Sequence, residues 1–258
     1  MSEHDELVTR LGEAMDNGEF EMFFQPEFDS AGTPIAVESL LRWRHPERGL
    51  VPPVVFLAIL EDSGLILPLG RWVLGEACAY SFRLAEAGWP GVTVSVNIST
   101  AQFTDVGMVD YLRKLVTEFH IPHGALELEL AESTVMAQPD RSVKVMGAVR
   151  ELGVTVAIGE FGTGYSSLST LHRVPADKIK IDRSVVRGVH ADADKAAICR
   201  SIVSMAHGKG LKVIAEGVEI HEEHAWLVAN GCDGVQGYLF ARPAPFDAML
   251  HALGPLPG

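Results

Sequence analysis

Polar side chains stand at or near the ends of most apolar segments in this 258-residue sequence. Six segments with strand-like patterns carry groups that bind cations or move protons: Glu38, Asn97, Glu129 with Glu132, Lys180 with Asp182, Glu216, and Gln236. Carboxylate and amide oxygens that converge from several strands suit a hard divalent cation such as Mg²⁺ or Mn²⁺. A lysine among them can hold or polarise a water molecule or a phosphate oxygen. The pattern predicts an oxygen-rich site for metal-assisted chemistry.

Each of these residues also has a simpler structural interpretation. A single acid after a strand is more often a helix cap or a surface residue than a ligand. Asn97 can cap a turn. Lys180 can be a purely structural residue that forms an ion pair with Glu216. The recurrence of compatible groups over six segments, four of them ending in acids, favours the functional interpretation.

The elements that would position these groups alternate between strand and helix. Strand patterns are predicted at 20–28, 35–43, 92–98, 126–130, 154–158, 178–181, 212–215 and 234–236. Helices are predicted at 1–17, 53–62, 67–87, 107–119, 140–152, 166–171, 193–209 and 221–229. A turn at 30–34 makes the first two strands antiparallel, and the alternation makes the others parallel with right-handed crossovers.

Eight strands in a chain of this length predict an α/β fold, a modified (β/α)8 TIM barrel with one antiparallel strand. The alternative is an open doubly wound sheet. That fold would need a glycine-rich dinucleotide turn after its first βα strand, and the sequence has none.

Composition narrows the function classes. Hydrophobic residues make up 47% and charged residues 21%, which excludes a disordered chain. No apolar run is long enough to predict a membrane span. The formal net charge of −13 disfavours general nucleic-acid binding. Cys78, Cys199 and Cys232 show neither zinc spacing nor a disulfide framework, which predicts a cytoplasmic location.

A series of motifs resembles the EAL domain family of bacterial cyclic di-GMP phosphodiesterases. The motifs are Phe24-Gln25-Pro26, Glu38-Ser39-Leu40, Leu41-Arg42-Trp43, Val96-Asn97-Ile98-Ser99, Glu129-Leu130-Ala131-Glu132-Ser133, Phe161-Gly162-Thr163-Gly164-Tyr165-Ser166-Ser167-Leu168, Lys180-Ile181-Asp182, Ala215-Glu216-Gly217-Val218-Glu219 and Gln236-Gly237-Tyr238. The resemblance covers about residues 18–245. It implies a single EAL domain over residues 1–258, in which the helix at 1–17 is of the kind that links such a domain to another module.

The resemblance implies roles for individual positions. The residues that resemble metal ligands are Glu38, Asn97 and Glu129, with Glu132, Glu160 and Asp182 as further candidates. Those that resemble the water-activating machinery are Lys180, Glu216 and Gln236. Those that resemble nucleotide contacts are Gln25, Leu40 and Arg42, and Glu219 resembles a residue that braces the loop at 162–167. The family reaction is hydrolysis of cyclic di-GMP to linear pGpG, assisted by two Mg²⁺ or Mn²⁺ ions.

The sequence departs from this family at Gly159-Glu160, where members that hydrolyse usually have two aspartates. Gly159 offers no side chain where the first aspartate would bind metal, and Glu160 is one methylene longer than the second. Losing a ligand commonly costs about tenfold or more in metal affinity or activity. We expect a side chain at 159 to point to the barrel mouth. The alternatives are that Glu160 compensates, or that glycine supplies an unusual backbone angle.

Three functions follow from these observations. The first is a cyclic di-GMP receptor with weak or no hydrolysis. The second is a working phosphodiesterase, because Glu38, Asn97, Glu129, Lys180 and Glu216 are all present. The third is a scaffold that binds neither metal nor nucleotide. A second copy of the chain or a protein effector is the further partner expected.

Overall fold

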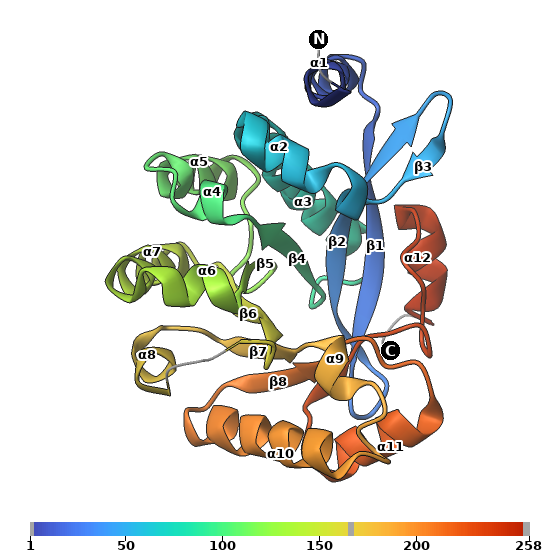
Figure 1. Ribbon diagram of the computed structural model, residues 1–258, viewed down its shortest axis with the longest axis vertical. Helices are drawn as coiled ribbons and strands as arrows, with labels where there is room; N and C mark the ends of the chain where they lie inside the picture. The colour runs from blue at the N-terminus through green and yellow to red at the C-terminus, as the bar shows by residue number, and fades with distance from the viewer. Residues whose placement is uncertain (1–2, 165–167, 255–258) are drawn as a thin grey trace.

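The strands of the protein close into a barrel. The computed structural model describes residues 3–164 and 168–254 (Figure 1). Its strands are β1 (Phe20–Asp29), β2 (Pro34–His45), β3 (Gly49–Val51), β4 (Thr93–Ile98), β5 (Leu126–Ala131), β6 (Thr155–Phe161), β7 (Lys178–Ile181), β8 (Lys212–Ala215) and β9 (Gly234–Val235). In these described parts, β1-β9-β8-β7-β6-β5-β4-β2 are neighbours in that order, and β1 pairs back onto β2.

The direction of the strands confirms the predicted barrel. β1 is antiparallel to β2 and to β9. The other neighbours around the ring pair in parallel. The short strand β3 extends β2 outside the ring and was not predicted, because three residues are too few to show a strand pattern.

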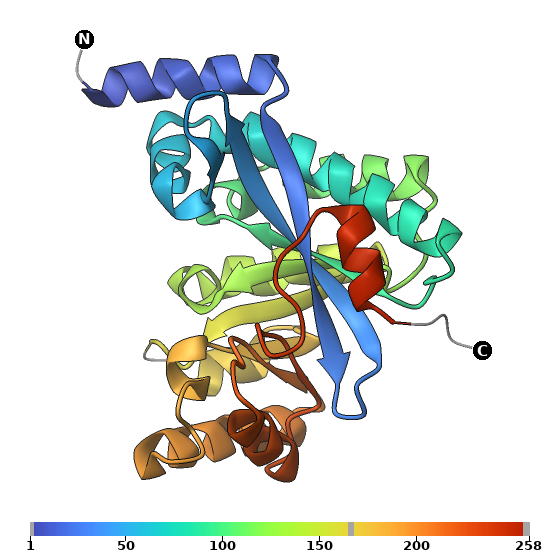
Figure 2. The ribbon, with the colours of Figure 1, turned by 90° about the vertical axis from the view of Figure 1, so that its right-hand side faces the viewer.

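Helices surround the barrel on its outer side (Figures 1 and 2). They are α1 (Glu3–Asp16), η1 (Pro53–Val55), α2 (Leu57–Ser63), α3 (Ile66–Glu86), α4 (Thr100–Phe103), α5 (Met108–Glu118), α6 (Glu132–Ala137), α7 (Pro139–Glu151), α8 (Leu168–Arg173), α9 (Arg183–Val186), α10 (Ala193–Gly208), α11 (His221–Ala229) and α12 (Phe246–Ala252). The helix predicted over 53–62 is divided at Phe56 into η1 and α2. Part of the helix predicted over 166–171 falls on residues 165–167, which lie outside the described residues.

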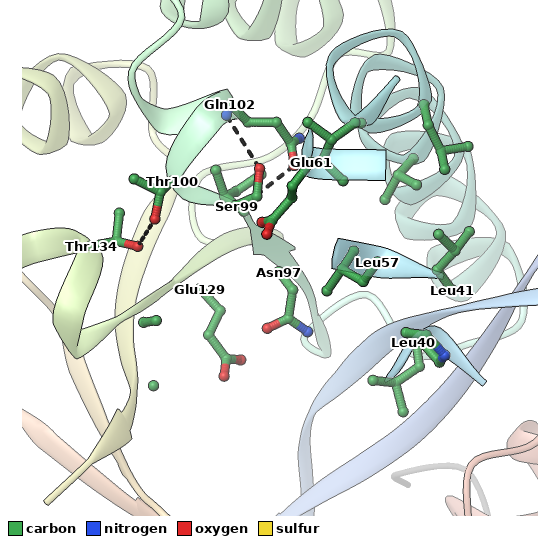
Figure 3. Close-up of a pocket in the computed structure, with 18 of the residues that line it drawn as sticks. Leu40, Leu41, Leu57, Glu61, Asn97, Ser99, Thr100, Gln102, Glu129 and Thr134 are labelled. Carbon is green, nitrogen blue, oxygen red and sulfur yellow. Dashed lines mark hydrogen bonds between the residues drawn. The ribbon is translucent and has the colours of Figure 1, made fainter. Parts of the chain in front are cut away.

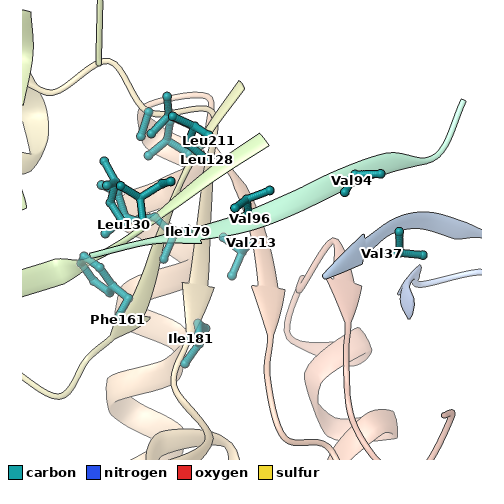
Figure 4. Packing of buried hydrophobic residues seen from close by; sticks show 14 of the residues in the cluster. Val37, Val94, Val96, Leu128, Leu130, Phe161, Ile179, Ile181, Leu211 and Val213 are labelled. Atoms are coloured by element: carbon teal, nitrogen blue, oxygen red, sulfur yellow. The ribbon is translucent and has the colours of Figure 1, made fainter. Parts of the chain in front are cut away.

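Alternate residues of the barrel strands face the helices and form the main hydrophobic core. Figure 4 shows part of this layer, with Val94, Val96, Leu128, Leu130, Ile179, Ile181 and Val213. The residues between them point the other way, because side chains alternate along a strand. On β5 these are Glu127 and Glu129, and on β7 they are Lys178 and Lys180. The barrel interior therefore holds charged side chains where most (β/α)8 barrels hold branched apolar ones.

A second hydrophobic cluster attaches the N-terminal helix to the barrel. Leu11 and Ala14 of α1 are fully buried in a cluster with Trp43 of β2 and Phe56. Figure 2 shows α1 lying across one end of the molecule, beside α2. Within the described residues, no helix combines the length and hydrophobicity that crossing a membrane requires.

A close contact between α3 and α4 builds one wall of the candidate site. Ser99 and Gln102 form a reciprocal capping box at the start of α4. A Cβ added at Gly70 of α3 would lie 2.1 Å from Gln102 Nε2, so glycine is required for this approach. Gly75 of the same helix has open space where its Cβ would be.

Asp233 closes the end of the barrel at which the parallel strands begin. Its carboxylate accepts hydrogen bonds from Val213 N at 2.8 Å, His207 Nε2 at 2.8 Å and Lys212 Nζ at 3.1 Å. Partial burial raises the pKa of Asp233. The hydrogen bonds from His207, Val213 and Lys212 outweigh that effect and hold the pKa below its ordinary value of 3.8.

Candidate active site and ligand pocket

Lys180 lies at the centre of the candidate site. Its side chain is fully buried, and its ammonium lies among four carboxylates from different parts of the barrel. Nζ is 2.7 Å from Glu129 Oε2, 2.9 Å from Glu27 Oε1, 3.2 Å from Glu216 Oε1 and 3.9 Å from Glu38 Oε2. The side chains come from β7, β5, β1 and β2 and from the segment after β8. The parallel strands end here, so the barrel brings together residues that lie far apart in the sequence.

Negative charge is crowded at this end of the barrel. Burial raises the pKa of Glu129 well above its ordinary value; the attraction of Lys180 opposes this, and repulsion by Glu38 and Glu216 adds to it. Burial also raises the pKa of Glu216, to about 7, again against the attraction of Lys180. Burial lowers the pKa of Lys180, but Glu129 and Glu27 lead a group of carboxylates that raise it well above its ordinary value. The ammonium is therefore charged, and Glu129 and Glu216 hold protons more readily than ordinary carboxylates. Burial also raises the pKa of Glu27, but Lys178 and Lys180 outweigh that effect and lower it to about 2.

Two amide side chains engage both oxygens of Glu38. Asn97 Nδ2 donates to Glu38 Oε1 at 2.7 Å, and Gln236 Nε2 donates to Glu38 Oε2 at 2.7 Å. Gln236 also lies 3.4 Å from Gln25 Oε1, and Gln25 Nε2 donates to the Ala241 carbonyl at 2.9 Å. The amide oxygen of the exposed Asn97 thus remains free of Glu38 and can accept from, or coordinate, a ligand, whereas the amide oxygen of Gln236 is buried.

The position of Gly159 meets the sequence-based expectation. A Cβ at this residue would lie 2.5 Å from Glu129 Oε1, so a side chain at 159 would point into the site. The Glu129 carboxylate occupies the place that such a side chain would take. Gly159 has no positive φ, so the backbone does not require glycine. The unusual backbone angle is found at the next residue instead, since Glu160 has a φ of 54°.

Glu160 lies at a strand irregularity on the edge of the site. The pairing of β6 with β7 shifts between Ile158 and Phe161. The Glu160 side chain is exposed, and its carbonyl accepts a hydrogen bond from Thr163 Oγ1 at 2.9 Å. A left-handed backbone is less favourable for glutamate than for aspartate or asparagine. Glu160 therefore borders the site but does not join the carboxylates around Lys180.

Three other predicted site residues lie away from the carboxylates around Lys180. Glu132 is buried at the start of α6 and accepts a hydrogen bond from Gly162 N at 3.0 Å. Asp182 accepts from Ser184 N at 2.8 Å and caps α9. Glu219 is exposed, and residues 165–167 of the loop that it would brace lie outside the described residues. Metal binding by Glu132 and Asp182 and bracing by Glu219 stay predictions, while the geometry gives Glu132 the loop contact.

A pocket of about 370 Å³ opens beside these carboxylates (Figure 3). Asn97 and Glu129 lie together on one side, with Gly159 and Glu160 also in the lining. The other side is apolar and is formed mainly by Leu40, Leu41, Pro53, Leu57, Ile66, Leu69 and Val73. A polar end joined to an apolar recess suits a ligand that has both a charged group and a flat or apolar group.

Arg42 follows Leu40 on the same face of β2. Leu40 lines the pocket, as expected for a ligand contact. The Arg42 guanidinium is half-buried, 5.5 Å from the centre of the Phe23 ring, and Nη1 donates to the Leu41 carbonyl at 2.8 Å. Burial lowers the pKa of Arg42, while Tyr238 and Glu38 raise it. The side chain thus lies near the site and is held by weak contacts that a ligand could replace.

Comparison with known proteins gives the family. The profile of the EAL domain matches residues 8–243. The chain belongs to the EAL domain family. It is 38% identical over 96% of its length to the bifunctional diguanylate cyclase/cyclic di-GMP phosphodiesterase MucR of Pseudomonas aeruginosa. It is 38% identical over 93% of its length to the cyclic di-GMP phosphodiesterase PdeR of Escherichia coli. The chain spans 36% of each of these relatives.

Solved structures of EAL proteins share the fold. The P. aeruginosa MucR phosphodiesterase in complex with cyclic di-GMP matches with a TM-score of 0.91 and 38% identity, over 95% of this chain and 99% of that one. The EAL enzyme Bd1971, bound to cAMP and cyclic di-GMP, matches with a TM-score of 0.90 and 33% identity, over 97% of this chain and 69% of that one.

The side chains of this EAL domain do not fit a pair of divalent cations as they are arranged. Among residues 3–164 and 168–254, no three Asp, Glu, His or Cys side chains are placed to hold a metal ion. Two observations account for this. The Lys180 ammonium already occupies the space between the carboxylates, and position 159 contributes no oxygen. The Glu129 carboxylate contacts the Lys180 ammonium and also fills the space beside position 159.

Three charged residues of the barrel interior were not predicted. Glu27 and Glu127 are buried, and both contact Lys178, at 3.1 Å and 2.9 Å. The alternation Leu126-Glu127-Leu128-Glu129-Leu130 and Lys178-Ile179-Lys180-Ile181 carries the missing signal. Because side chains alternate between the two faces of a strand, Glu127 and Lys178 must point into the barrel if Glu129 and Lys180 do. Glu27 stands two positions after the predicted site residue Gln25 on β1, so the same alternation could have found it.

Proposed function

We propose that this EAL domain binds cyclic di-GMP and acts as a receptor, with weak or no hydrolysis. One observation carries the second half of the proposal. The Glu129 carboxylate fills the place of a side chain at Gly159 and pairs with Lys180 at 2.7 Å. Phosphodiesterases of this family generally depend on Mg²⁺ or Mn²⁺, and such a cation stabilises the attacking and leaving oxygens of the phosphodiester. The donor set here is not arranged for that pair of cations.

Nucleotide binding is supported by the pocket and by the relatives. MucR and Bd1971 have been solved with cyclic di-GMP bound. In this chain the pocket offers Leu40 and an apolar recess for a base, and the amide oxygen of Asn97 for polar groups. Arg42, on the same face of β2 as Leu40, is the cation that we expect to meet a phosphate, because its guanidinium can form charge-assisted hydrogen bonds. Gln25, the other nucleotide contact expected from the sequence, is buried beside Gln236.

The alternative is an active phosphodiesterase that produces pGpG. It is favoured by the two relatives named as phosphodiesterases and by the position of Glu160 in the pocket lining. In that case Lys180 and Glu216 would hold the attacking water, and Glu160 would supply the missing carboxylate. A cytoplasmic setting and a second copy or protein effector as partner belong to either proposal. The cytoplasmic setting is supported only by the cysteine usage.

Titration calorimetry followed by product analysis separates the proposals. Cyclic di-GMP is titrated into the protein in EDTA and then in Mn²⁺, and the mixtures are chromatographed for pGpG. We expect binding under both conditions and little or no product. Rapid formation of pGpG would establish the enzyme. A lack of binding under both conditions would leave only a scaffold that acts through protein contacts.

A further inference from the structure

A chain of alternating charges lies behind Lys180 in the barrel interior. Lys178 Nζ is 2.9 Å from Glu127 Oε1 and 3.1 Å from Glu27 Oε2. The other oxygen of Glu27, Oε1, is 2.9 Å from Lys180 Nζ. Lys180 in turn contacts Glu129 at 2.7 Å. Glu27 therefore links the two lysines, one carboxylate oxygen to each.

Glu27 holds Lys180 from the barrel side, whereas the other carboxylates hold it from the mouth. On the antiparallel pair β1–β2, Gln25 lies opposite Glu38, and Glu27 lies opposite Ala36, two residues deeper in the barrel. The Glu27 side chain is fully buried, and Lys178 fixes its second oxygen. If Glu27 were lost, every remaining carboxylate near Lys180 would lie at the mouth, and the ammonium would move outward toward Glu38, now 3.9 Å away.

We infer that Glu27 is a positioning residue, which sets how deeply the ammonium of Lys180 sits and thereby how much negative charge the mouth presents to a ligand. With Glu27 in place, Lys180 pairs with Glu216 at 3.2 Å but leaves Glu38, at 3.9 Å, only loosely paired. An ammonium that moved outward would neutralise Glu38 as well. That movement would raise the affinity for an anionic nucleotide and lower the affinity for a divalent cation, because a positive charge at the mouth attracts the first and repels the second. The inference takes the nature of the nucleotide from the proposed function.

Two substitutions of Glu27 separate position from charge. Glu27→Asp keeps the charge but shortens the side chain by one methylene, so the ammonium loses its inner contact. Glu27→Gln removes the charge as well. Glu127→Gln is the matched control, because it removes a buried carboxylate that pairs with Lys178. Crystal structures of the three variants give the position of Lys180 Nζ directly. We expect Nζ to reach hydrogen-bonding distance of Glu38 in both Glu27 variants and to stay in place in Glu127→Gln.

Binding measurements then test the consequence for ligands. Mn²⁺ alone and cyclic di-GMP in EDTA are titrated into each folded variant, with circular dichroism as the check on folding. In both Glu27 variants we expect Mn²⁺ affinity to fall and nucleotide affinity to rise, each by about threefold or more. Glu127→Gln should change neither. In a Lys180→Met background, Glu27→Gln should also change neither, because the effect acts through the lysine.

Several outcomes overturn the inference. It is wrong if Nζ stays in place in the Glu27 variants, or if Glu27→Asp behaves as the parent and only loss of charge matters. It is equally wrong if Glu127→Gln shows the same shifts, or if both affinities fall together. If Glu27→Gln does not fold, Glu27→Asp decides. A parent protein that does not bind cyclic di-GMP contradicts the proposed function, while the position of Nζ still decides this inference.

Discussion

Restoring two aspartates at Gly159 and Glu160 should convert this domain into a faster phosphodiesterase. The Cβ of residue 159 would lie 2.5 Å from Glu129 Oε1, whereas ordinary contact begins at 3.4 Å. The Glu129 carboxylate must therefore retreat by about 1 Å, and its Cγ, which would lie 3.1 Å from the new Cβ, by a few tenths of an ångström, which a change of rotamer can provide. At position 160, where φ is 54°, aspartate is better tolerated than glutamate. The backbone thus accepts both changes.

Repulsion between carboxylates sets how much stability the double variant loses. Two carboxylates about 4 Å apart repel by about 4 kcal/mol at an effective dielectric constant of 20, and proton uptake by Glu129 relieves part of this. In EDTA we expect the double variant Gly159→Asp/Glu160→Asp to lose about 1–3 kcal/mol of unfolding free energy. That loss corresponds to a Tm lower by about 2–10 °C in a chain of this size. Mn²⁺ should restore the Tm of the variant more than that of the parent.

The assay is pGpG production at saturating Mn²⁺, measured by chromatography, with Glu160→Asp alone as the control. We expect the double variant to be faster than the parent by about tenfold or more, a difference of about 1.4 kcal/mol in barrier. If the double variant folds, binds cyclic di-GMP and remains as slow as the parent, then Gly159 is not the cause of slow hydrolysis. If the parent is already fast, Glu160 performs the task of the aspartates and the receptor proposal fails.

Three further substitutions test the ligand site and the fold. Arg42→Ala should weaken cyclic di-GMP binding in calorimetry by about 1–3 kcal/mol, the value of a charge-assisted contact, whereas the exposed Arg44→Ala should not; equal effects would remove Arg42 from the site. Asp233→Asn should lower the unfolding free energy in urea by about 1 kcal/mol at pH 7, after allowance for solvent screening. The pKa of the Asp233 carboxyl in the folded protein is depressed below 3.8, so its contribution to stability is present above pH 3.8 and is lost as the pH falls through the folded-state pKa. A difference in unfolding free energy between parent and Asp233→Asn that persists below that pKa would contradict the depressed pKa. In α3, Gly70→Ala should lower the unfolding free energy by about 1–3 kcal/mol in denaturant titrations, whereas Gly75→Ala should raise it by about 0.5–1 kcal/mol. A Gly70→Ala variant as stable as the parent would show that Gln102 is not fixed against residue 70.

The order of strands and helices could be predicted because the periodicity of the sequence changes clearly along the chain. Leu126-Glu127-Leu128-Glu129-Leu130 shows both the strand and the two faces that it presents. The short elements β3, α4, α6, α9 and α12 were not predicted, because segments of three to seven residues are too short to show a clear period. The break at Phe56 depends on tertiary packing, since this side chain is buried against Trp43 and Phe20.

The candidate site could be predicted residue by residue but not as an arrangement. Glu38, Asn97, Glu129 and Lys180 stand at strand ends, and a barrel must bring such positions together. The sequence does not show that Lys180 would take the space between the carboxylates, because that depends on the distances between side chains across the barrel. Nor does it show that Glu132 contacts the loop at Gly162, since a buried acid after a strand fits either role.

We propose that the nucleotide binds in this barrel mouth without a metal ion. The most direct test is titration calorimetry of the full chain with cyclic di-GMP in EDTA, with GTP as the comparison ligand. We predict saturable binding of cyclic di-GMP in EDTA, with about one equivalent per chain, and much weaker binding of GTP. Binding of cyclic di-GMP that disappears in EDTA and returns only with Mn²⁺ would contradict the account.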